Sequence, residues 1–212
     1  MATYPGPGGH GPVQDTAPAR TDHDDPETPD SPGAAEVLRQ IEPLITQAPW
    51  FSRLGALLSD EERGLAADYV QALGFPEIGI GAVEDWTDAA LIAANPGIDT
   101  FAWEAEEQLR LAERDAAREA LSAPGLSALL AMVEGLAANI VFARAATAAE
   151  AAGMDDPELI EAAGAHAVQA CHQAALALAN EAAPTHPFIL KFRLFAAGRW
   201  PLGITGATFN LF

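Results

Sequence analysis

The sequence predicts an all-α protein: an orthogonal or antiparallel helical bundle with an Ala-rich helical hairpin and a short C-terminal aromatic β-hairpin or extended tail. Three observations support this prediction. Apolar residues recur at helical spacing from Ala34 onward. Ser or Asp side chains precede several of these segments, in the position of helix N-caps. Two of the segments are rich in Ala, whose small side chain lets helices pack closely.

The first 33 residues differ in composition from the rest of the chain. They contain seven of the 16 prolines, five glycines and an acidic run from Asp22 to Asp30. A segment with so few apolar side chains cannot bury enough surface to offset the entropy lost on ordering. We therefore expect residues 1–33 to form a disordered Pro/Gly-rich acidic tail.

Residues 34–97 predict an N-terminal helical lobe. Its first helix, 34–47, carries apolar side chains along one face. Ser59 and Glu62 have the spacing of a capping box, in which each side chain accepts a hydrogen bond from the other residue's backbone. A second helix is expected to begin there and to end at Gly74.

The remainder of this lobe contains more turn signals. Residues 75–83 include three Pro or Gly residues, so we expect a loop. Asp85 is the expected N-cap of a short helix, 86–94, and the Asn-Pro-Gly sequence at 95–97 ends it.

Residues 98–212 predict a three-helix unit with an aromatic C-terminal segment, although 34–212 is also compatible with one domain. Its long helices are expected at about 100–122, 124–152 and 156–182. The last two are Ala-rich and should pack as an antiparallel hairpin.

The helix at 100–122 combines aromatic and charged residues. Phe101 and Trp103 are expected on its apolar side. The helix also has i,i+3 and i,i+4 spacings typical of surface ion pairs, so we expect its charged face to be solvated; the pairs are Glu106–Arg110, Glu107–Arg110 and Asp115–Arg118.

The last segment, 184–212, has a different composition. Five of the nine phenylalanines lie here, and no acidic residue does. The stop signal at Gly198 favours a short helix before it, although the alternation of Phe with polar residues is also compatible with a strand. The following residues predict a hairpin that turns at Thr205 and Gly206.

The net charge of −19 argues against several functions. Nucleic acids and anionic membrane surfaces attract basic faces, so we expect neither as a partner. The longest uncharged stretch, between Glu161 and Glu181, contains His and Gln side chains and is too polar to span a bilayer. The single cysteine, Cys171, lies on the apolar side of its helix. We expect a soluble, cytoplasmic protein.

No motif predicts a metal or a cofactor. A di-metal carboxylate bundle needs Glu three residues before His on two helices, and no histidine here has that neighbour. Gly79-Ile-Gly81 lacks the third glycine of a dinucleotide fingerprint. The phosphate-loop spacing at 198–205 has Ile204 in place of the required lysine.

The last long helix has a polar arc that includes His166 and His172 and lacks Lys and Arg. An ordinary solvated face is one interpretation. The other is a polar cleft between the 124–152 and 155–182 helices, where Glu134, His166 and His172 would bind a small molecule or act as catalytic groups. Convergence of the three side chains on one pocket would support the second interpretation.

Basic and aromatic residues gather near the C-terminus, namely Lys191, Arg193, Arg199 and Trp200. In one interpretation the aromatic side chains fill the core and the cations pair with acids of the helices. In the other, these four residues form an edge that binds a partner, because Trp and Arg are common interface residues.

We expect a non-enzymatic helical interaction module, of inhibitor, immunity or adaptor type, whose acidic surface engages a basic partner protein. Solubility alone also explains the charge. The alternative is the small-molecule or enzymatic cleft described above. A third option is a homodimer formed through the Phe-rich C-terminal segment.

Overall fold

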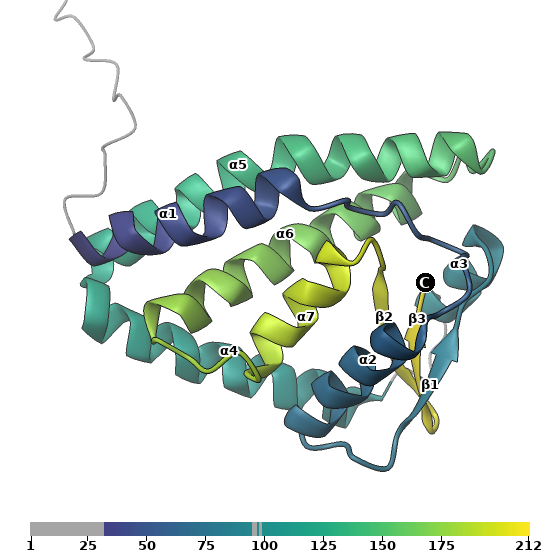
Figure 1. Cartoon of the computed structure of the whole chain (residues 1–212), viewed down its shortest axis with the longest axis horizontal. Coiled ribbons are helices and arrows are strands. Elements are labelled where there is room, and N and C mark those ends of the chain that lie inside the picture. The colour runs from purple at the N-terminus through teal and green to yellow at the C-terminus, as the bar shows by residue number, and fades with distance from the viewer. Residues whose placement is uncertain (1–31, 95–96, 98) are drawn as a thin grey trace, which may run out of the picture.

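The computed structural model describes residues 32–94, 97 and 99–212, and these are mostly helical (Figure 1). The predicted disordered tail lies outside the described residues, apart from its last two, which begin the first helix. The described residues form seven helices and three strands: α1 (Pro32–Gln47), α2 (Asp60–Ala72), β1 (Gly79–Ala82), α3 (Trp86–Ala93), α4 (Thr100–Leu121), α5 (Ala123–Ala151), α6 (Pro157–Ala179), α7 (Pro187–Ala196), β2 (Pro201–Thr205) and β3 (Thr208–Leu211).

Side-chain caps fix where four of these helices begin. Ser59 and Glu62 form the predicted capping box at α2. Asp85, Asp99 and Asp156 accept hydrogen bonds from backbone N–H groups in the first turns of α3, α4 and α6. These caps satisfy donors that a helix leaves unpaired, which is why the predicted starts are confirmed to within one residue.

α5 and α6 lie side by side and run in opposite directions, with α1 along them (Figure 1). Small residues allow this close approach: a Cβ atom at Gly164 of α6 would overlap the Phe142 ring of α5. Cys171 is buried on the apolar side of α6, as predicted, and desolvation raises the pKa of its thiol to about 12. Cys171 is therefore a small core residue, and its thiol does not act as a nucleophile.

The expectation of a loop over residues 75–83 is wrong for residues 79–82, which form the strand β1. β2 and β3 form the predicted hairpin, but β3 also pairs in parallel with β1, giving the strand order β1-β3-β2. Gly81 permits this pairing, because a Cβ atom there would lie 2.6 Å from Cγ2 of Thr208. The chain therefore adds a small sheet to the predicted helices, and β3 is its central strand.

The aromatic residues of α4 do not enter the core. Phe101 is 75% exposed and Trp103 is 64% exposed, whereas Ala102, Ala117 and Leu121 are buried. The expectation of an inward aromatic face on this helix is therefore wrong. Small side chains form its packed face because α4 lies against α5 and α6.

α5 has the length and apolar composition that would suffice to cross a membrane. The core helix of a soluble protein, which is mostly buried, also meets this criterion, but only 28% of the apolar stretch of α5 is buried. The buried positions of α5 recur at helical spacing and include Leu129, Val133, Ala137 and Val141. α7 forms a helix rather than a strand, so the expectation that Gly198 stops a helix is confirmed.

Candidate functional site

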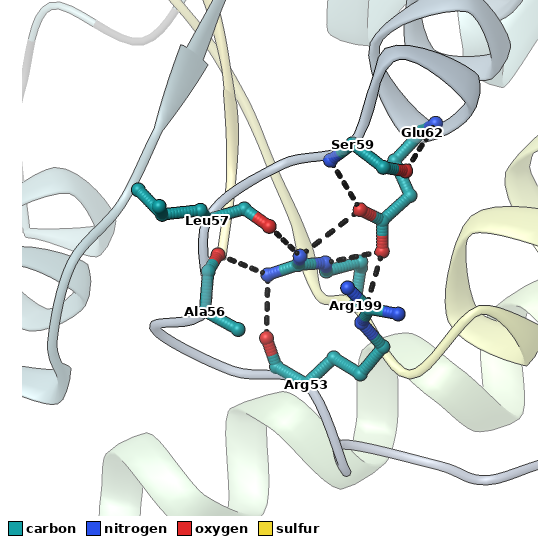
Figure 2. A network of polar contacts seen from close by, with 6 residues as sticks. All are labelled: Arg53, Ala56, Leu57, Ser59, Glu62 and Arg199. Atoms are coloured by element: carbon teal, nitrogen blue, oxygen red, sulfur yellow. Dashed lines mark hydrogen bonds and ion pairs between the residues drawn. The ribbon is translucent and has the colours of Figure 1, made fainter.

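The guanidinium of Arg199 is fully buried and occupies a polar pocket made by a loop and the start of α2 (Figure 2). Its Nε donates to Oε1 of Glu62 at 2.8 Å, and Nη2 donates to Oε2 at 3.1 Å. The other donors reach the backbone carbonyls of Arg53, Ala56 and Leu57 at 2.5, 2.7 and 2.9 Å. All five N–H groups are thereby satisfied, so Arg199 has none left for a partner.

Glu62 takes part both in this network and in the N-terminal cap of α2. Its Oε2 accepts from the Ser59 backbone N–H at 2.7 Å, while Ser59 Oγ accepts from the Glu62 N–H. The hydrogen bond from Arg199 is the main cause that lowers the pKa of Glu62 to about 2, from an ordinary 4.5. The pair links the N-terminal part of the chain to the segment between α7 and β2.

This shift predicts how stability depends on pH. Because the folded-state pKa lies below the unfolded value, the charged carboxylate stabilises the fold above pH 4.5, and the stabilisation is lost as pH falls towards 2. The loss is about 3 kcal/mol for such a shift. Urea unfolding at pH 7, 4.5 and 3 should show a smaller acid-induced loss for Glu62→Gln than for the wild type. Equal acid-induced losses of stability in Glu62→Gln and in the wild type would contradict the assignment of this pH dependence to Glu62.

A second buried polar cluster lies around Glu106 of α4. Its carboxylate accepts hydrogen bonds from Tyr69 Oη at 2.7 Å, Gln173 Nε2 at 2.6 Å and Lys191 Nζ at 2.5 Å. Desolvation raises the pKa of Glu106, but the Lys191 cation and these hydrogen bonds outweigh it and hold the pKa below its ordinary value. Of the two pairs expected for Arg110, the pair with Glu107 is formed and the pair with Glu106 is not, because Lys191 binds the Glu106 carboxylate.

His166 lies beside this cluster and not beside Glu134. Its Nδ1 accepts from the Trp200 indole N–H at 3.1 Å, so the proton of the neutral ring is on Nε2. Desolvation, aided by the Lys191 cation, lowers the pKa of His166 to about 4. His166 and Lys191 line a cavity of about 200 Å³ between α2, α4 and β2.

The basic and aromatic C-terminal residues mostly point inward. Lys191, Arg199 and Trp200 are buried, and only Arg193 of the four is exposed. The phenylalanines of the same segment are buried too: Phe188, Phe192, Phe195, Phe209 and Phe212. This placement favours the interpretation as an intramolecular clasp, in which aromatic side chains fill the core and cations pair with acids. It leaves Arg193 alone available for the predicted partner-binding edge.

Glu134 and His172 come together in a groove between α4, α5 and α6, which we call the α4–α5–α6 groove. Its volume is about 730 Å³, and Arg110 and Arg114 of α4 form the opposite wall. Glu134 raises the pKa of His172 by its charge, but desolvation dominates and keeps the pKa below its ordinary value. The three predicted cleft residues thus do not share one pocket, since two of them line this groove and His166 lines the other cavity.

Two buried polar atoms in the walls of this groove have no hydrogen-bond partner among the described residues: His172 Nε2 and Gln173 Oε1. The Gln173 amide orientation is fixed because its Nε2 donates to Glu106. A hydrogen bond with the Leu130 backbone acts to raise the pKa of His172. Both atoms are shielded from solvent, and an unpaired buried polar atom costs about 1–3 kcal/mol.

Sequence reasoning did not single out Arg114, Glu106 or Glu62 as site residues. Arg114 follows Arg110 by one helical turn, and that i,i+4 spacing is the signal that places both on one wall. Within residues 32–94, 97 and 99–212, no three His, Cys, Asp or Glu side chains gather as a metal site. Comparison of the chain with protein-family models, with curated proteins and with solved structures gives no match.

Proposed function

We propose that this chain is a soluble, cytoplasmic, non-enzymatic helical-bundle protein that binds a small polar molecule in the α4–α5–α6 groove. The observation that carries the proposal is the lining of this groove, where Glu134, His172 and two arginines of α4 lie beside apolar side chains. A few charged and polar groups beside apolar surface can hold and orient a small molecule.

The size and lining of the groove support the same proposal. Its volume of about 730 Å³ lies within the range of small-molecule sites, roughly 300–1,000 Å³. Leu130, Phe142 and Leu176 supply apolar surface, and Arg114 and Glu134 supply one charge of each sign. A few polar groups on an apolar wall are the usual composition of a binding site.

A thermal-shift screen with amino acids, amines, carboxylic acids, sugars and nucleosides tests this function. A compound that binds only the folded state should raise Tm by several degrees at a hundredfold excess over Kd. Ala165→Phe places a large side chain in the groove at an exposed position and should abolish the shift. Ala143→Phe, at an exposed position of α5 outside the groove lining, is the control. Shifts that persist in Ala165→Phe would contradict the proposal, as would a screen without hits.

The second candidate function is the acidic protein-interaction module, and the exposed aromatic pair on α4 favours it. Phe101 and Trp103 are mostly exposed and lie among Asp99, Glu104 and Glu107. Large exposed aromatic side chains commonly anchor protein interfaces, and the surrounding carboxylates would favour a basic partner.

Tagged protein incubated with host lysate at low and high salt tests the interaction module. We expect a basic partner that is captured at low salt and released at high salt. With the purified partner, Phe101→Ala/Trp103→Ala should weaken binding at least about tenfold, a typical effect for interface anchors. Leu91→Ala removes another exposed apolar side chain, on α3, and should have no effect. Equal losses in both variants would argue against this surface.

A further inference from the structure

We infer that the cavity beside Lys191 is a second ligand site, which takes a small uncharged ketone or aldehyde and holds it as an iminium on Nζ of Lys191. Glu106 exchanges protons with Lys191 in this reaction, and His166 donates a hydrogen bond to the carbonyl oxygen. Lys191 lines this cavity between α2, α4 and β2 and does not line the α4–α5–α6 groove, so the inference is independent of the proposed function.

Lys191 is the only lysine of the chain, and it is mostly buried. Its side chain is 11% exposed and lines the cavity of about 200 Å³. One N–H group of its ammonium donates to Oε1 of Glu106 at 2.5 Å, and the other two have no acceptor among the described residues. Because buried polar groups are normally hydrogen-bonded, these two N–H groups require acceptors from outside the chain, namely water or a ligand in this cavity.

His166 supplies a second donor to the same cavity. Its Nδ1 accepts from the Trp200 indole, so Nε2 carries the proton, and this N–H has no acceptor among the described residues. The charge of Lys191 helps to lower the pKa of His166 to about 4, so the two side chains lie close enough to interact and the ring is neutral at pH 7. A carbonyl oxygen can accept from His166 and from Lys191 because it has two lone pairs.

Glu106 is held in place as a base for Lys191. Tyr69 Oη donates to its Oε2 at 2.7 Å, and Gln173 Nε2 donates to its Oε1 at 2.6 Å. Tyr69 and Gln173 are themselves 3% and 1% exposed, so neither can turn away from the carboxylate without leaving a buried polar group unpaired. Oε1 therefore stays beside Nζ of Lys191, within the distance over which a proton passes between acid and base.

The short contact between Lys191 and Glu106 allows an iminium to form without another reactant. A proton moves from the ammonium to the Glu106 carboxylate, which leaves a neutral amine. The nitrogen attacks the carbonyl carbon: a C–N bond forms, the C=O π bond breaks, and a second nitrogen proton moves to the oxygen. The Glu106 carboxylic acid then protonates the resulting hydroxyl, which leaves as water. Ammonium and carbonyl compound have become iminium and water, and the regenerated carboxylate pairs with the iminium.

The lining of the cavity selects an uncharged, apolar carbonyl compound. Arg110 neutralises Glu107, which leaves the carboxylates of Asp99 and Glu106 against the single ammonium of Lys191. This excess of negative charge disfavours anions such as keto acids. Apolar side chains supply much of the remaining wall, namely Leu73, Trp103, Leu202 and Ile204. An apolar cavity of about 150 Å³ holds benzene, so about 200 Å³ suffices for a compound of that size.

Reductive trapping of the full chain with 2-butanone and sodium cyanoborohydride at pH 7 tests the inference. Cyanoborohydride reduces an iminium to a stable amine, and peptide mass spectrometry then locates the added butyl group. Arg63→Lys places a control amine at an exposed position of α2 in the same molecule. A solvated lysine is almost fully protonated at pH 7 and has no base beside it. We therefore expect Lys191 to be alkylated at least about a hundredfold faster than the control lysine.

Two further measurements assign the binding step and the base. The rate at Lys191 should saturate as the 2-butanone concentration rises, because the ketone binds in the cavity before it reacts. Glu106→Gln keeps a hydrogen-bond acceptor but cannot take the proton, so it should slow alkylation of Lys191 about a hundredfold. Glu107→Gln changes the neighbouring acid, which is bound to Arg110, and should leave the rate unchanged. Tm measurements check that both variants fold.

Three results would overturn the inference. Alkylation of Lys191 no faster than that of the control lysine would exclude an activated amine. A rate that rises linearly with 2-butanone concentration, without saturation, would exclude binding in the cavity. Trapping of pyruvate as fast as 2-butanone would overturn the uncharged class of ligand. These three measurements use only the wild type and Arg63→Lys, so they decide the inference even if Glu106→Gln does not fold.

Discussion

Replacing Arg199 with methionine is expected to lower the free energy of unfolding by about 3–5 kcal/mol, as for other broken buried ion pairs. The substitution leaves the Glu62 carboxylate buried without its counter-charge. It also leaves the backbone carbonyls of Arg53, Ala56 and Leu57 without their donors (Figure 2). Because the Glu62 carboxylate is buried, most of the cost of its desolvation remains. Urea unfolding at pH 7 measures the change.

Arg53 provides the matched control. Its side chain is 50% exposed and lies 3.3 Å from the same Glu62 carboxylate. An exposed pair of this kind contributes about 0–1 kcal/mol, so Arg53→Met should have a small effect. The double variant Glu62→Leu/Arg199→Met should lose less stability than the two single variants combined, because neither charge is then left alone. Similar losses for Arg53→Met and Arg199→Met would refute the assigned role of the buried guanidinium.

Replacing Glu106 with leucine should lower the free energy of unfolding by about 3–5 kcal/mol, as much as the Arg199 substitution does. The Lys191 ammonium, whose side chain is 11% exposed, would lose its counter-charge. Tyr69 and Gln173 would also lose the acceptor of their side-chain hydrogen bonds. Desolvation is the main cause that raises the pKa of Tyr69 well above its ordinary value, and the charge of Glu106 adds to it. The phenol is therefore a hydrogen-bond donor that needs an acceptor at pH 7.

The neighbouring acid is the control for this second substitution. Glu107 forms its ion pair with Arg110 at the surface, with side chains 29% and 28% exposed. Glu107→Leu should therefore change the free energy of unfolding by no more than about 1 kcal/mol. Adding Lys191→Met to Glu106→Leu should restore part of the lost stability, because the unpaired buried charge is removed. A double variant less stable than Glu106→Leu would show that the broken ion pair is not the main cause of the stability lost in Glu106→Leu.

The elements that sequence predicts well are those specified by neighbours in the chain. The capping box at Ser59 and the N-caps Asp85, Asp99 and Asp156 each act within three residues, so the helix starts follow from the sequence. β1 could not be found in this way. Its pairing partner is more than 100 residues further along, and Gly79-Ile-Gly-Ala lacks the alternation of a half-buried strand.

The candidate site also combines features that neighbours in the chain specify with features that distant residues decide. The i,i+4 spacing of Glu106 and Arg110 predicts a surface pair, but Lys191, from a distant helix, takes the carboxylate into a buried cluster. Polarity alone placed His166 and His172 on one arc of a helix. Their separation into two cavities depends on which neighbours pack against each end of that arc, namely β2 at one end and α5 at the other, whereas α4 lines both cavities. Periodicity contains no information about those neighbours.

The position of β3 in the sheet has a consequence for synthesis on the ribosome. β1 gains its partner only after Thr208–Leu211 has been made, and Arg199 reaches Glu62 at nearly the same stage. At about 5–20 residues per second, translation leaves the first strand and the α2 region waiting for on the order of ten seconds. During that interval an unpaired strand edge and an uncompensated carboxylate are exposed to other chains. A chaperone that shields β1 and the α2 region until β3 is available would therefore raise the yield of folded protein.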